Sequence, residues 1–122
     1  MRIALAIWKG RISPVFDVSQ QILILDVEEG VIINKSRENL ADNNPNLKAA
    51  NLAASGVHTL ICGALSREVE DSLATYGIET ISFIAGDVGL VVSAYMNGEL
   101  SDSSFCMPGC DAGHIKMRER GA

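Results

Sequence analysis

The chain has 122 residues, of which 48% are apolar, and a formal net charge of −5. This length fits one domain, which buries about two-thirds of the surface that its unfolded chain exposes, so no disulfide or metal is needed for folding. The negative charge argues against a nucleic-acid binder, because such proteins gain affinity by neutralising phosphates. No apolar run approaches the roughly 20 residues of a membrane span.

The compartment is predicted from the first residues and from the cysteines. The apolar run at residues 1–7 is followed by a charged segment without a small-residue cleavage site, so we expect a buried strand of a cytoplasmic protein. The cysteines are Cys62, Cys106 and Cys110. An odd number without a secretion signal predicts thiols, metal ligands or redox groups instead of a disulfide framework.

Three strands are predicted in the first third of the chain. Residues 2–8 form a continuous apolar stretch with β-branched members, which is typical of a strand covered on both faces. Residues 21–27 and 31–36 form two further strands, and the segment 28–30 between them, Glu-Glu-Gly, has the composition of a hairpin turn.

Helices and strands alternate in the rest of the chain. Three helices are predicted between Asn44 and Gly56, Ser66 and Gly77, and Asp87 and Gly98, each with a capping residue at its start and a glycine at its end. Pro45 occupies the first helical position of the first one. The predicted apolar stripes are Leu47, Ala50 and Ala54; Val69, Leu73 and Tyr76; and Val88, Val91, Val92 and Tyr95.

Two short apolar strands, 58–62 and 78–84, separate these helices. The order is therefore βββαβαβα, in which the later strands are parallel and joined by right-handed crossovers. The fold class that we predict is α/β, a mixed five-stranded sheet with three helices on its faces. Residues 1–100 are expected to form the single domain, and residues 101–122 a C-terminal tail.

The predicted ligand site lies at the carboxyl ends of the parallel strands, where ligands bind in open α/β sheets. Two loops leave that edge, residues 9–19 and 63–66. Gly63 lets the backbone approach a ligand, and the free N–H groups of the helix that starts at Ser66 favour an anion. Arg11 adds a positive charge. Each residue alone is more typical of an ordinary turn, but together they predict an anionic ligand.

Cys62 ends a predicted strand beside this loop. A lone cysteine at such a position is most often a small buried apolar residue. A ligand or redox role is the alternative.

The tail contains the residues with the most reactive chemistry. Cys106, Cys110 and His114 recur every four residues, but the Pro108-Gly109 pair favours a tight turn over a helix. Thiolates and an imidazole are soft ligands, suited to zinc, copper or iron–sulfur species, although three ligands at this spacing do not match a standard zinc site. A reversible disulfide and a tail without a chemical role are the alternatives.

No enzyme signature is present. Ribonuclease H-like nucleases need clustered carboxylates, one of them in the first strand, and residues 3–7 carry none. Neither a P-loop nor a Gly-x-Gly-x-x-Gly pattern occurs. We therefore predict a protein that is not an enzyme.

Three segments together are typical of one known family: Gly10-Arg11-Ile12-Ser13-Pro14-Val15-Phe16-Asp17, Ile61-Cys62-Gly63-Ala64-Leu65-Ser66 and Met107-Pro108-Gly109-Cys110. Over about residues 1–100 the chain resembles the dinitrogenase iron–molybdenum cofactor biosynthesis family, which includes NifX-like proteins and the C-terminal domain of NifB. The resemblance implies a ribonuclease H-like sheet. It also implies non-catalytic binding of an iron–molybdenum-type or other metal–sulfur cluster, for storage or for delivery to an apo-acceptor or scaffold protein.

The chain differs from nitrogen-fixation members at one position. They usually carry His-Phe-Gly in the first loop, with the histidine implicated in cluster binding, where this chain has Val15-Phe16-Asp17. The hypothesis is that Cys106 and Cys110 replace that ligand. A redox-sensing or protein-interaction module that uses the same cysteine pair is the alternative function. The expected cofactor-binding residues are Arg11, Ser13, Phe16, Asp17, Cys62, Gly63, Ala64 and Ser66, and the expected metal ligands are Cys106, Cys110 and His114.

Overall fold

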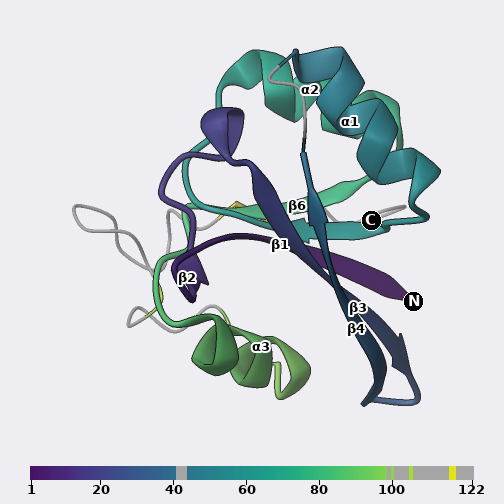
Figure 1. Cartoon of the computed structure of the whole chain (residues 1–122), viewed down its shortest axis with the longest axis vertical. Coiled ribbons are helices and arrows are strands. Elements are labelled where there is room, and N and C mark those ends of the chain that lie inside the picture. The colour runs from purple at the N-terminus through teal and green to yellow at the C-terminus, as the bar shows by residue number, and fades with distance from the viewer. Residues whose placement is uncertain (41–43, 99, 101–104, 106–115, 118–122) are drawn as a thin grey trace.

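The computed structural model describes residues 1–40, 44–98, 100, 105 and 116–117. Within these residues the chain forms a mixed sheet, three α-helices and one short 3-10 helix, η1 (Figure 1). The strands are β1 (Arg2–Trp8), β2 (Arg11–Ile12), β3 (Gln21–Glu28), β4 (Val31–Asn39), β5 (Thr59–Ile61), β6 (Glu79–Ser82) and β7 (Lys116–Met117). The helices are η1 (Phe16–Val18), α1 (Pro45–Ala54), α2 (Arg67–Thr75) and α3 (Val88–Met96).

The sheet order is β4-β3-β1-β5-β6-β7, and β2 folds back onto the end of β1. β1, β5 and β6 are parallel, whereas β3, β4 and β7 pair in antiparallel fashion. The α/β class, the mixed sheet and the three helices are therefore confirmed. All five predicted strands are present, but the predicted number is wrong, because the described residues also form β2 and β7. Those strands have two residues each, too few for a periodic pattern.

Helices cover both faces of the sheet (Figure 1). On one face, Ala4 and Ala6 of β1 belong to a core shared with α1 and α2. On the other face, Ile3, Leu5 and Ile7 belong to a core shared with α3. Burial on both faces explains the continuous apolar sequence of β1. None of the helices in the described part of the chain is long and apolar enough to cross a membrane.

The three predicted helix starts are confirmed by their caps. The side chain of Asn44 accepts hydrogen bonds from the backbone N–H groups at the start of α1. Ser66 does the same for α2, and Asp87 for α3. These side chains satisfy donors that have no partner within the helix.

The predicted stripe of α1 is wrong. Leu47 is 50% exposed, and Ala54 is exposed as well. The buried face is instead formed by Lys48, Ala49 and Leu52. The apolar residues of α1 cover more than half of its circumference, with Leu47 and Leu52 on opposite flanks of the alanines, so apolar spacing alone could not identify the buried side.

The other two stripes are partly confirmed. Val69 and Leu73 of α2 are buried, but Tyr76, which follows the helix as its C-terminal cap, is exposed. In α3, Val91 and Ala94 form the buried face. The remaining predicted members, Val88, Val92 and Tyr95, pack at its margin.

The loops that follow β1 and β5 are fastened directly to each other. The backbone N–H of Ala64 donates to Pro14 O, and that of Phe16 donates to Ala64 O, both over 2.8 Å. A Cβ atom on Gly63 would lie 2.5 Å from both Ser13 O and Pro14 O. Only a residue without a side chain allows the two main chains to approach this closely.

Cys62, at the end of β5, is fully buried in the core shared by α1 and α2. Burial raises the pKa of its thiol, and the negative charges of Asp17 and Glu70 raise it further. The neutral thiol therefore dominates at physiological pH, as expected for a cysteine that serves as a small apolar core residue.

We predict that Gly63→Ala lowers the free energy of unfolding by about 1–3 kcal/mol, the usual effect of overpacking. The new methyl group must displace main-chain oxygen atoms, which cannot rotate away. Urea unfolding would measure the change. Gly89→Ala in α3 is the control, because its added Cβ meets only the Asp87 side chain, at 3.2 Å, and alanine favours a helix over glycine. Equal stability of Gly63→Ala and wild type would contradict the close approach.

We predict that Cys62 resists iodoacetamide at pH 8 in the folded protein, because alkylation requires a thiolate and access to it. In urea the same residue should react at the rate of an ordinary thiol. Mass spectrometry of the Cys62 peptide would measure the extent of labelling separately from the other cysteines. Rapid labelling of this peptide without denaturant would show that Cys62 is not a core residue.

Candidate functional site

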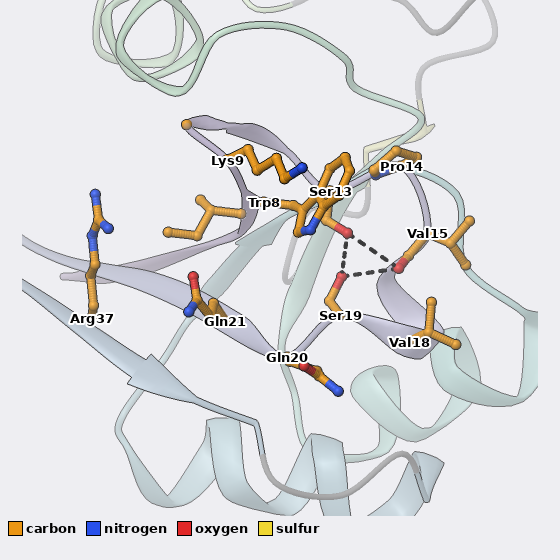
Figure 2. Close-up of a pocket in the computed structure, with 12 residues that line it drawn as sticks. Trp8, Lys9, Ser13, Pro14, Val15, Val18, Ser19, Gln20, Gln21 and Arg37 are labelled. Atoms are coloured by element: carbon orange, nitrogen blue, oxygen red, sulfur yellow. Dashed lines mark hydrogen bonds between the residues drawn. The ribbon is translucent and has the colours of Figure 1, made fainter.

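A groove of about 710 Å³ opens where β1 ends. It lies beside the loop that leads from β1 through η1 to β3, and β4 closes its far side (Figure 2). The lining residues are Ile7, Trp8, Lys9, Gly10, Ser13, Pro14, Val15, Val18, Ser19, Gln20, Gln21 and Arg37. The groove thus lies at the end of the sheet where we expect a ligand, but on the outer side of the first loop.

The charges of the groove are all of one sign. Among the described residues that line it, Lys9 and Arg37 are the only ionisable ones, and none is an aspartate or a glutamate. The chain as a whole contains 15 acidic and 10 basic residues. An acidic protein with a cationic groove directs anions to that groove.

Apolar side chains complete the groove. Trp8 is 56% exposed, and the Lys9 ammonium lies 4.6 Å from the centroid of its ring. Val15 and Val18 are exposed on the opposite wall. A few polar groups in a mainly apolar cleft are typical of small-ligand sites, where they orient the ligand.

Two buried serines hold the first loop in shape. The Ser19 hydroxyl lies 2.7 Å from that of Ser13 and 2.9 Å from Val15 O (Figure 2). The backbone N–H of Ser19 also donates to Phe16 O over 3.0 Å. The segment from Ser13 to Ser19 is therefore fixed at both ends, and its middle forms one wall of the groove.

The predicted anion site at the start of α2 has a ligand from the chain itself. Asp17 Oδ1 accepts a hydrogen bond from the Ser66 backbone N–H over 2.8 Å, and the Ser66 hydroxyl accepts from the N–H of Val69. Because the Asp17 carboxylate supplies the negative charge that a helix N-terminus favours, this pair joins the first loop to α2.

The remaining predicted cofactor-binding residues lie in different places. Ser13 is the one member of the predicted set that lines the groove. Phe16 is buried in the core. Cys62 is buried too, whereas Gly63 and Ala64 form the contact between the two loops. Arg11 is exposed, and its backbone pairs with that of Asp87.

The predicted metal ligands Cys106, Cys110 and His114 lie outside the described residues. Within the part of the chain that the structure describes, no group of three or more histidine, cysteine, aspartate or glutamate side chains could hold a metal ion. The groove therefore offers hydrogen bonds, charge and apolar contact to a ligand.

Lys48 of α1, which the sequence did not single out, lies behind the groove and contacts the first loop. It is fully buried, and its Nζ donates to Phe16 O and to Asp17 O, each over 2.8 Å. The ammonium also lies 4.9 Å from the centroid of the Phe16 ring. Burial lowers the pKa of Lys48, and the Asp17 carboxylate opposes that shift.

Solved structures show the same fold at low sequence identity. PH0822 has a TM-score of 0.76 at 18% identity, over 81% of this chain and 93% of that one. MJ0327 from Methanocaldococcus jannaschii has a TM-score of 0.67 at 21% sequence identity, and the match covers 81% of this chain and 90% of that one. The apo form of the orange protein from Desulfovibrio gigas has a TM-score of 0.68 at 19% sequence identity, and the match covers 90% of this chain and 94% of that one.

A search of curated proteins found no match to the chain. The family model described as dinitrogenase iron-molybdenum cofactor matches residues 1–98. This match covers both loops that meet at Gly63 and every residue of the groove. The chain therefore belongs to the dinitrogenase iron–molybdenum cofactor family.

Proposed function

We propose that the protein binds an anionic iron–molybdenum-type or other metal–sulfur cluster in this groove and carries it to an acceptor or scaffold protein, without catalysing a reaction. Family membership supports the ligand class. The observation that carries the proposal is a groove whose described lining has two cationic residues and no carboxylate, in a chain of net charge −5.

The chemistry of the lining suits such a ligand. The N–H groups of Lys9 and Arg37 can donate to sulfide atoms at a cluster's surface, and donors with full charge make the stronger hydrogen bonds. Trp8 and the exposed valines offer apolar contact to the same polarizable sulfur atoms, as aromatic rings do to thioether sulfur. Ser13 belongs to this proposed contact set.

The C-terminal tail provides the metal ligands in this proposal. Cys106 and Cys110 supply thiolate ligands, with His114 as a third ligand. They bind the metal directly while the groove holds the sulfide surface of the cluster.

The two loops that meet at Gly63 support the groove, with Arg11 at their margin. Residues 1–100 act as the binding domain in the cytoplasm, and the ribonuclease H-like type of sheet that the family resemblance implies belongs to the same proposal. The redox-sensing alternative depends on thiols outside the described residues, and nothing in the described part favours it.

We predict that tetrathiomolybdate, a small thiometallate anion, binds the wild-type protein. The Lys9→Gln/Arg37→Gln variant should bind it about tenfold or more weakly, because each lost charge-assisted hydrogen bond counts for about 1.5–3 kcal/mol. A titration followed by the absorption of the anion would measure the affinity. Added salt should weaken wild-type binding more than binding to the variant.

The matched control is Lys35→Gln/Arg67→Gln, which removes the same charge from two exposed residues outside the groove. Its affinity should stay within about twofold of wild type, since neither side chain lines the groove and a charge at the solvated surface interacts only weakly with a neighbouring anion. An equal loss of affinity in both double variants would mean that net charge alone attracts the anion. No binding to wild type at all would refute the groove as a thiometallate site.

We predict that Cys106→Ser/Cys110→Ser abolishes the uptake of iron with sulfide under anaerobic conditions and leaves the urea unfolding midpoint unchanged. Thiolates bind metal as anions, so wild-type uptake should also weaken as the pH falls and they protonate. Metal and sulfide analysis of the purified protein would measure uptake. Full uptake by the double variant would show that the tail thiols are not ligands.

A further inference from the structure

We infer that Lys48 is a positioning residue for the groove: its buried ammonium holds the η1 wall in place and thereby sets the affinity for an anionic ligand. The inference about affinity rests on the proposed function. The inference about the wall rests on the hydrogen bonds of Lys48 alone.

The burial of Lys48 is exceptional among the charged side chains of the described residues, since the others retain solvent contact. A charged group inside a protein is costly unless hydrogen bonds compensate it. Here the compensating acceptors are two consecutive main-chain carbonyls, Phe16 O and Asp17 O. An ammonium placed under the backbone of a loop in this way fixes that backbone, because it donates to Asp17 O and shares Phe16 O with the Ser19 N–H, so the loop cannot move without breaking these bonds.

The fixed backbone is the wall of the groove. Phe16 and Asp17 lie between Val15 and Val18, whose side chains line the cavity. η1 has only three residues, and such short 3-10 segments have little stability of their own. Lys48 reaches this wall from α1, 31 residues away from Asp17 in sequence. Its hydrogen bonds go to Phe16 and Asp17, neither of which lines the cavity itself. Its action on a ligand is therefore indirect.

The consequence for binding follows from population arithmetic. A ligand that fits only one position of the wall binds with an apparent Kd equal to the intrinsic Kd divided by the fraction of molecules in that position. If loss of the ammonium leaves the wall in place about a tenth of the time, the apparent Kd rises about tenfold. Lys48 would thus act by preorganisation, which reduces the cost of ordering the site on binding.

The test compares Lys48→Met with Leu52→Ala in the full-length protein. Methionine keeps the unbranched length of lysine and removes only the ammonium. Leu52 lies in the same helix, is as deeply buried, and belongs to the same core without bonding η1. Two quantities are measured in each folded variant: the affinity for tetrathiomolybdate, and the hydrogen-exchange rate of the Ser19 amide, which donates to Phe16 O. The Val91 amide in α3, which donates to Asp87 O, serves as an internal reference.

We expect Lys48→Met to weaken tetrathiomolybdate binding about tenfold. It should also speed exchange at Ser19 relative to Val91, because exchange reports local opening. Leu52→Ala should destabilise the whole domain yet leave the Ser19 to Val91 ratio and the affinity of the folded protein unchanged. Unchanged values in Lys48→Met, or equal changes in both variants, would overturn the inference.

The two proposals fail in different ways. If wild-type protein does not bind tetrathiomolybdate, the proposed function falls and the effect on affinity falls with it. Exchange at Ser19 then still decides whether Lys48 holds the wall. If wild type binds and Lys48→Met binds equally well with unaltered Ser19 exchange, the proposed function stands and the role of Lys48 is wrong.

Discussion

The close contact of Gly63 with the Ser13 and Pro14 carbonyls determines where the groove lies. Two main chains that approach this closely leave no space between the loops after β1 and β5. The space lies instead on the outer side of the first loop, between η1, the end of β1 and β4 (Figure 2). The contact therefore supports the groove from behind, and a side chain on Gly63 would displace its wall.

Three interactions hold the first loop from different directions. The Asp17 carboxylate joins it to the start of α2, the Lys48 ammonium joins it to α1, and the serine pair closes it on itself. Each of these groups looks functional in isolation, and two of them carry a charge. Their partners lie within the protein, however, so their charges are already engaged. Among the described residues that line the groove, Lys9 and Arg37 are the cations that can face an anion.

The sequence predicted the features that depend on local pattern. The continuous apolar stretch of β1, the caps at Asn44, Ser66 and Asp87, and the alternation of helices with strands all follow from rules that act within a few residues. The buried side of α1 could not be predicted in this way, because its apolar residues cover more than half of the helix circumference and only packing selects Leu52 over Leu47.

The site was harder to predict than the fold. Its general location at the end of β1 followed from the sheet topology. The residues that line the groove could not be predicted from topology. Arg37 comes from the edge strand β4, and which side chains of β4 face the groove depends on the register between β3 and β4. The burial of Lys48 is a tertiary effect as well, since a lysine in a helix is normally exposed. Three-dimensional proximity of this kind leaves no local signal.

The central claim is that the ligand lies in the groove on the outer side of the first loop. Amide and indole chemical shifts, recorded by NMR while tetrathiomolybdate is added, test it most directly. The account predicts the largest shifts at Trp8, Ser13, Ser19 and Gln21, with small changes at the start of α2, where Asp17 already provides the anion. Large shifts at Ser66 and the N-terminus of α2, with none at Trp8 or Gln21, would contradict it.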